Sequence, residues 1–223
     1  MGKNVERAKE MLPAIILTIL SMIQALALEL YWTRLVESEL LWQGGIDSLL
    51  FWLQAVAVLV GIVLVWLVHV SFVLRFTWLP SLEDMVIPFI IGILEFAMID
   101  LMHPEFVGLW MLLLAAVFAV SIAASHFTMR RARREPENDY FFRGMSPGTW
   151  RDYRHSIAAV AELISFGLVI CFLPVGDLVA VLGLFVALAA LGYQTRQTRR
   201  YWMHSVGSDN PDETGTGEPQ VGL

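Results

Sequence analysis

Six long apolar segments constrain the fold of this chain more than any other feature of its sequence. They cover about 11–32, 48–76, 82–102, 106–129, 156–173 and 177–193. Roughly 20 apolar residues let a helix cross a bilayer, whereas soluble helices carry an apolar stripe and transmembrane strands alternate in polarity. The sequence therefore predicts an all-α integral membrane protein, a bundle of six transmembrane helices.

The composition agrees with a membrane protein and excludes several other classes. Hydrophobic residues make up 57% and charged residues 16% of the 223 residues, against about 45–50% and about 25% in soluble domains. Cys171 is the one cysteine, which excludes a disulfide framework and a multi-cysteine metal site within one chain. Nothing in the composition suggests a nucleic-acid partner, so we expect none.

The positive charges predict the orientation. Fourteen of the 15 Lys and Arg residues lie at the N-terminus, after the second apolar segment, in 130–155 or after the sixth segment, and only Arg34 lies elsewhere. Short loops that retain Lys and Arg are cytoplasmic. We therefore expect a multi-pass protein of the plasma (inner) membrane with both termini in the cytoplasm.

The sequence divides into three parts on this basis. Residues 1–10 form a cytoplasmic N-terminus, 11–204 the transmembrane domain and 205–223 a disordered acidic tail. The arginine-rich connection 130–155 is expected on the cytoplasmic face. There it contacts anionic lipids or, alternatively, a docking partner. Its arginines include Arg130, Arg131, Arg133 and Arg134.

Two carboxyls lie at hydrocarbon depth, Glu95 in the third segment and Glu162 in the fifth, and every Lys and Arg lies in a loop or at a segment end. An ionised carboxylate in hydrocarbon costs several kcal/mol without such a partner. Each carboxyl must therefore be protonated, hydrogen-bonded, hydrated, or neutralised by a cation or a histidine. The candidate hydrogen-bond partners are Gln24, Gln54, Ser121 and Ser165.

Further titratable groups lie nearer the outer side, and the outer loops are acidic, which attracts cations. The predicted ion pathway comprises Glu29, Glu95, Asp100, His103 and Glu162. These features favour a small channel or carrier for protons or cations, either as one bundle or as a homo-oligomer with a shared path. The alternative is a structural or regulatory membrane protein whose protonated glutamates donate interhelical hydrogen bonds.

Pro88 and Gly92 interrupt the third segment between its acidic residues. A proline inside a helix frees the carbonyl four residues earlier and weakens the helix there. We expect these two residues to form a hinge or gate.

Two weaker hypotheses concern bound metal or haem. Asp100 and His103 share a helical face and would supply two ligands to a divalent metal, but a site needs three or four. A b-type haem needs two facing histidines, for which the inner-side candidates are His69, His126 and His155. No catalytic motif with fixed spacing is present, so the sequence gives no indication of an enzyme or of a specific cofactor.

Overall fold

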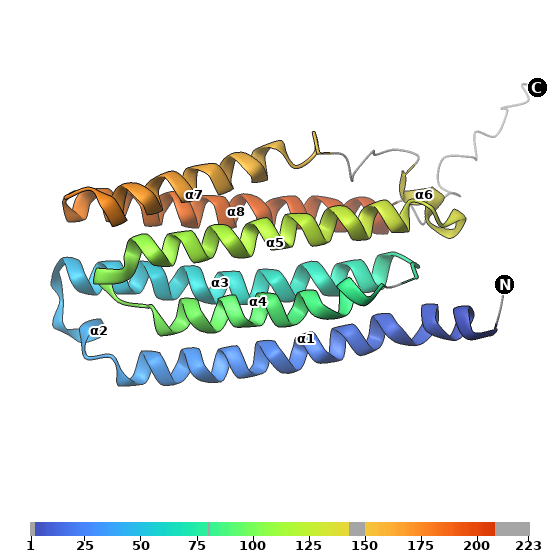
Figure 1. Ribbon diagram of the computed structural model, residues 1–223, viewed down its shortest axis with the longest axis horizontal. Helices are drawn as coiled ribbons and strands as arrows, with labels where there is room; N and C mark the ends of the chain where they lie inside the picture. Colours follow the sequence, from blue (N-terminus) through green and yellow to red (C-terminus); the bar gives the residue numbers. More distant parts are fainter. Residues whose placement is uncertain (1–2, 80, 143–149, 208–223) are drawn as a thin grey trace, which may run out of the picture.

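A computed structural model describes residues 3–79, 81–142 and 150–207. Within these ranges the regular structure is helical, and six long helices run along one common direction (Figure 1). They are α1 (Lys3–Glu37), α3 (Gly45–Arg75), α4 (Leu82–Asp100), α5 (Val107–Ala132), α7 (Arg154–Phe172) and α8 (Asp177–Gly207). The short elements are α2 (Leu40–Gln43), η1 (Pro104–Phe106), η2 (Pro136–Asn138) and α6 (Asp139–Phe142).

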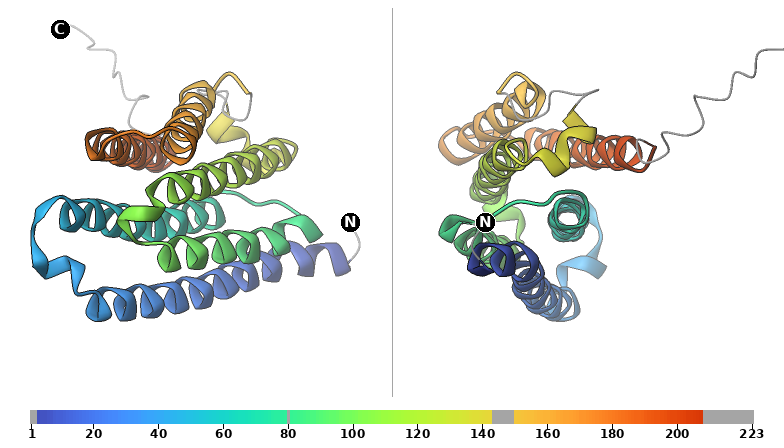
Figure 2. Two further views of the ribbon diagram at one scale, coloured as in Figure 1. Left: turned by 60° about the vertical axis from the view of Figure 1, so that its left-hand side comes forward. Right: turned by 90° about the vertical axis from the view of Figure 1, so that its right-hand side faces the viewer.

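The six long helices close into a ring, in the spatial order α1, α4, α5, α7, α8, α3 and back to α1. The end-on view in Figure 2 shows α1 and α4 on the side opposite α7 and α8, with α5 between them. The N-terminus, α6 and the C-terminal part of α8 lie at one end, which we call the arginine-rich end (Figure 1). The turn between α1 and α3 and the turn between α7 and α8 lie at the other end, the acidic end.

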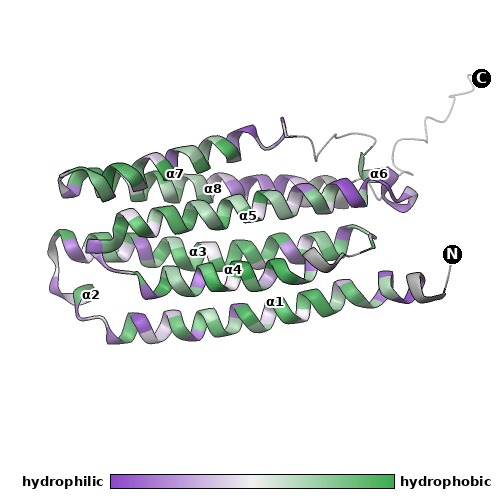
Figure 3. Ribbon diagram, in the orientation of Figure 1, coloured by the Kyte–Doolittle hydropathy of each residue, from purple (hydrophilic) through white to green (hydrophobic). Residues whose placement is uncertain are grey.

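Five of the described helices are long and apolar enough to cross a membrane: α1, α3, α5 with η1, α7 and α8. Figure 3 shows apolar residues around their middles and hydrophilic residues toward the ends. These helices confirm an all-α protein with the properties of a multi-pass membrane protein. The helix α4 falls outside this group because its 19 residues include Glu83, Asp84, Glu95 and Asp100. The sixth span therefore stays a prediction.

The helices extend beyond the apolar segments that predicted them. The helix α1 begins at Lys3 and ends at Glu37, and α8 continues to Gly207 instead of ending near 193. Residues 205–207, expected in a disordered tail, are therefore helical, and the rest of that tail lies outside the described residues. The length of an apolar segment reflects the thickness of the hydrocarbon layer. A helix can be longer than this segment, because its backbone hydrogen bonds continue through polar residues of good helix propensity.

The connection expected over 130–155 is also more regular than a loop. The helix α5 continues to Ala132, η2 and α6 follow, and α7 already begins at Arg154. Asn138, which is 1% exposed, donates from Nδ2 to the carbonyl oxygens of Thr77 and Ala132 at 2.8 and 2.7 Å. This side chain ties the α3–α4 connection to the end of α5, so the arginine-rich end is a packed structure.

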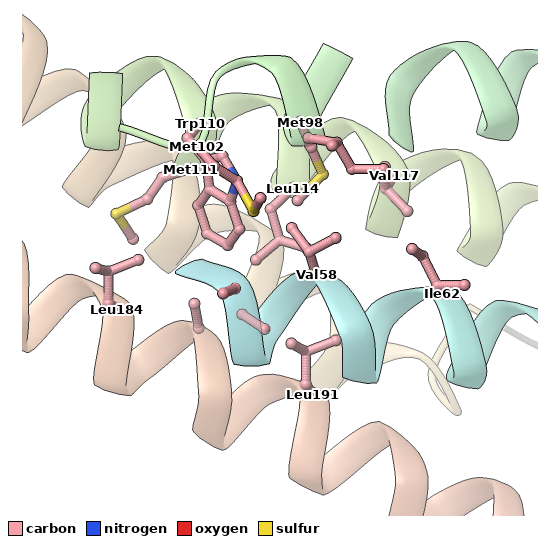
Figure 4. Packing of buried hydrophobic residues seen from close by; sticks show 14 of the residues in the cluster. Val58, Ile62, Met98, Met102, Trp110, Met111, Leu114, Val117, Leu184 and Leu191 are labelled. Atoms are coloured by element: carbon pink, nitrogen blue, oxygen red, sulfur yellow. The ribbon is translucent and has the colours of Figure 1, made fainter. Parts of the chain in front are cut away.

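The main core lies where α3, α4, α5 and α8 meet (Figure 4). Trp110 of α5 is 0% exposed and is flanked there by methionines and branched aliphatic side chains. The labelled neighbours of Trp110 include Val58, Met102, Met111 and Leu114. Close packing of this kind fixes the relative positions of the helices that carry the polar residues described below.

Glycines bring α5 and α7 into backbone contact. A Cβ atom added to Gly108 would lie 3.0 Å from the carbonyl oxygen of Gly167 and 3.0 Å from the backbone nitrogen of Cys171. Small residues at an interface between membrane helices permit this approach, which larger side chains would prevent. The pair therefore sets the spacing between α5 and α7.

We predict that Gly108→Ala will lower the free energy of unfolding by about 1–3 kcal/mol, the usual cost of forcing extra atoms into a packed interface. Gly192→Ala on α8 is the matched control, because a Cβ there meets nothing within 4 Å. Thermal unfolding in detergent will compare the two. Equal melting temperatures for both variants would contradict the α5–α7 packing described here.

Candidate functional site

Glu95 and Gln24 form a buried polar pair between α4 and α1. Each residue is 4% exposed, and Gln24 Nε2 donates a hydrogen bond of 2.8 Å to Glu95 Oε2. Glu95 Oε1 and Gln24 Oε1 are both buried and have no hydrogen-bond partner among the described residues. Glu95 takes part in none of the ion pairs found among the described residues. Of the candidate partners named from the sequence, Gln24 is thus the one that binds Glu95.

Gly92 explains how α1 comes close enough to form this pair. A Cβ atom on Gly92 would overlap Cγ2 of Ile23, the residue next to Gln24. Gly92 also lies three residues before Glu95 on α4, so it shares a face with it. Pro88, the other residue of the expected hinge, lies inside α4, which is continuous through it. Gly92 therefore has a packing role, whereas a hinge at Pro88 and Gly92 stays a prediction.

A cavity of about 150 Å³ lies in the arginine-rich half of the bundle, and all six long helices contribute to its lining. Most of the lining is apolar, but polar side chains are spread along it. They include His69, Ser71, Ser121, Ser125, Thr128 and Gln194. One buried water molecule needs a cavity of roughly 10–15 Å³, so this cavity is large enough for several water molecules. Ser121 Oγ is buried without a hydrogen-bond partner among the described residues, and water in the cavity would satisfy it.

His69 and Tyr153 are two polar residues of this lining. His69 Nδ1 donates to the carbonyl oxygen of Val65 at 2.8 Å, which leaves Nε2 as an acceptor for a proton or a water molecule. Tyr153 also lines the cavity, directly before the start of α7. Burial raises the pKa of the Tyr153 phenol, and Tyr201 and Asp152 add to this effect. Tyr153 is therefore a neutral hydrogen-bonding group in the cavity lining.

About two helical turns of α1 and α4 separate the cavity from the buried pair. Leu20 of α1 and Ile91 of α4 are both 0% exposed. Ile16 and Ile87, each four residues away on the same helices, line the cavity, whereas the Gln24–Glu95 pair lies four residues away in the other direction. Four residues of helix rise about 6 Å. We call Leu20 and Ile91 the apolar barrier.

The structure does not gather the other residues of the expected ion pathway around Glu95. Glu29, Asp100 and Glu162 are exposed on α1, α4 and α7, and His103 is half-buried at the N-terminus of η1. Because α4 packs on α5, and α5 packs on α7, Glu162 lies on the far side of α5 from Glu95. Glu95 is therefore buried between helices, whereas the other carboxyls of the expected pathway are exposed on the outside of the bundle.

The three histidines considered as haem ligands also have different surroundings. Only His69 lines the cavity. The ring of His126 stacks on Trp150 with 4.4 Å between ring centroids, and His155 lies against Tyr193 at 5.8 Å. The cavity thus offers one of the two histidine ligands that a b-type haem needs.

The candidate metal ligands lie at the acidic end. The backbone oxygen of Asp100 accepts a hydrogen bond from Arg34, and His103 Nδ1 accepts one from the backbone nitrogen of Glu105, both at 3.4 Å. Among the described residues, no group of three or more His, Cys, Asp or Glu side chains is placed to hold a metal ion.

Arg131 differs from the other arginines expected to contact lipid. Its Nη1 donates to Asp84 Oδ2, and Asp84 is 8% exposed and also caps α4 by accepting from the backbone nitrogen of Ser81. Arg131 therefore fastens α5 to the start of α4, which the sequence analysis missed. The capping-box residues Ser81 and Asp84 indicate in the sequence where α4 begins. They do not indicate that Asp84 pairs with Arg131. Arg130, Arg133 and Arg134 are exposed.

Comparison with protein-family models, curated protein sequences and solved structures found no match for this chain. Its described residues combine a buried carboxyl, an apolar barrier and a mostly apolar cavity with several polar groups in its lining. Chemically, this arrangement can hold a proton or a cation at Glu95 and can admit water up to the barrier.

We predict that water reaches the cavity but not the barrier. In a Cys171→Ala background, Ser121→Cys should react with a water-soluble thiol reagent at least roughly tenfold faster than Leu20→Cys, because a thiol buried among apolar groups stays protonated and unreactive. The rates are measured on folded protein by mass spectrometry. Equal rates at the two positions would show that the cavity is dry or that the barrier is open.

Proposed function

We propose that α4 crosses the membrane as a sixth span and that the arginine-rich end lies in the cytoplasm, as expected for the plasma (inner) membrane. The position of α4 in the ring, between α1 and α5, supports this proposal. Asp84 lies in its first turn and Asp100 is its last residue, so both lie near the ends of the span. Among the described carboxyl side chains of α4, only Glu95 then lies at hydrocarbon depth.

We further propose that the protein handles protons or cations as a small channel or carrier, with Glu95 as the exchanging group. The observation that carries this proposal is a buried carboxyl whose hydrogen-bond donor is an amide and not a cationic side chain. Such a carboxyl is stable in hydrocarbon when it holds a proton or a bound cation. Release of that proton or cation is the elementary step of transport.

The two sides of the buried pair differ in a way that supports directional exchange. On the arginine-rich side, a cavity with polar groups in its lining reaches Ile16 and Ile87, eight residues or about 12 Å of helix from the pair. On the acidic side, surface carboxylates raise the local concentration of cations. These include Glu37, Glu39, Asp47 and Glu105. In this proposal the apolar barrier closes the path at rest, and separation of Leu20 from Ile91 connects Glu95 to the cavity.

We predict that Glu95→Gln will reduce proton or cation flux into liposomes at least about tenfold while keeping the free energy of unfolding within about 1 kcal/mol of the wild type. Glutamine keeps the volume and most of the hydrogen bonding of a neutral glutamate but cannot exchange a proton or carry charge. Flux is followed with an entrapped pH-sensitive or cation-sensitive dye under an imposed voltage.

The control is Glu10→Gln, the same change at an exposed position of α1, which should leave flux within about twofold. A structural role for the Gln24–Glu95 hydrogen bond gives the opposite pattern: Glu95→Gln would leave flux unchanged, and Glu95→Ala would destabilise the fold. Wild-type liposomes without flux above empty ones would rule out transport.

A further inference from the structure

Glu162 lies near the middle of α7 and points away from the bundle. It is eight residues from Arg154 and ten from Phe172, the two ends of the helix, or about 12 and 15 Å along the axis at 1.5 Å per residue. Its side chain is exposed and forms no hydrogen bond or ion pair among the described residues. A carboxyl thus faces the lipid at about the depth where burial in hydrocarbon is most costly.

Small residues surround Glu162 on this side of α7. With 3.6 residues per turn, Ala158, Ala161 and Ser165 lie within an arc of about 100° that includes Glu162, and all three are exposed. Ala161 and Ser165 are four apart, the spacing that lets two membrane helices approach closely. We call these four residues the Glu162 face.

The polar groups of this face are able to satisfy one another across two copies of the chain. A protonated carboxyl carries both a donor and acceptors, so two identical carboxyls can hydrogen-bond reciprocally. Ser165 Oγ donates to the carbonyl oxygen of Ala161 at 2.8 Å, which leaves its lone pairs free to accept from a neighbour. The face is therefore complementary to itself.

Membrane topology strengthens the case for a second copy over a different partner. Identical chains insert with the same orientation and depth, so a two-fold axis along the membrane normal brings each Glu162 opposite its counterpart. An unrelated membrane protein would match this depth only if it carried a polar group at the same level.

We propose that the Glu162 face of α7 is the interface through which two copies of this chain associate in the membrane. Association covers both carboxyls, and the small side chains allow the two α7 helices to pack closely. This proposal does not depend on transport, because it concerns the outer surface of α7 and not the buried pair.

Cross-linking of purified protein in lipid vesicles tests the interface. In a Cys171→Ala background, Ala161→Cys treated with a short bismaleimide should give a covalent dimer. Ile93→Cys is the matched control, because Ile93 is 67% exposed on α4, a different helix of the ring. A monomeric Ala161→Cys chain, or equal dimer yields at the two positions, would overturn the proposal. A product in native membranes whose mass differs from two copies would overturn it as well.

Two substitutions of Glu162 test the role of the carboxyl. Glu162→Leu should weaken dimer association by roughly 3- to 30-fold, the effect of losing one interhelical hydrogen bond. Glu162→Gln should keep association within about twofold, because two amides also pair reciprocally. Energy transfer between labelled chains at increasing lipid dilution measures both. If Glu162→Leu associates as tightly as the wild type, the carboxyl does not hold the interface.

Discussion

A carboxyl that is buried in an apolar bundle and bonded to an amide is the constraint on which the other features depend. Within the described part of the chain, Glu95 receives one hydrogen bond, from Gln24, and this bond requires α1 to pack closely on α4. Gly92 permits that packing, because any side chain there would overlap Ile23. The geometry of the α1–α4 interface and the chemistry of Glu95 are therefore linked, and a change in one must alter the other.

The two mid-depth carboxyls illustrate how burial divides roles within one bundle. Glu95 lies inside, about two helical turns from the cavity lining on α4, where loss or gain of a proton or cation changes the charge of the core. Glu162 lies outside on α7, where the same chemical group favours contact with another polar surface. In our account the first serves transport and the second serves assembly, although both residues are equivalent intramembrane acids when only the sequence is considered.

The presence of the long helices was predictable from the sequence, because segment length and apolar content are local properties. Gln24 was also among the hydrogen-bond partners expected for Glu95. The faces of the helices were not predictable: core-facing and lipid-facing positions are both apolar in a membrane, so α7 carried no pattern that would show Glu162 on its outside. The cavity and the Asp84–Arg131 pair were missed because each combines side chains from helices far apart in the sequence.

The central claim is that α4 crosses the membrane and carries Glu95 into the hydrocarbon. Leu79 and Glu105 flank α4, and both are exposed, at 42% for the residue and 78% for the side chain respectively. In a Cys171→Ala background, an impermeant thiol reagent applied to sealed cells and to inverted vesicles will locate Leu79→Cys and Glu105→Cys. Our account predicts labelling of Glu105→Cys from outside and of Leu79→Cys from the cytoplasmic side. Labelling of both positions from the same side would contradict it.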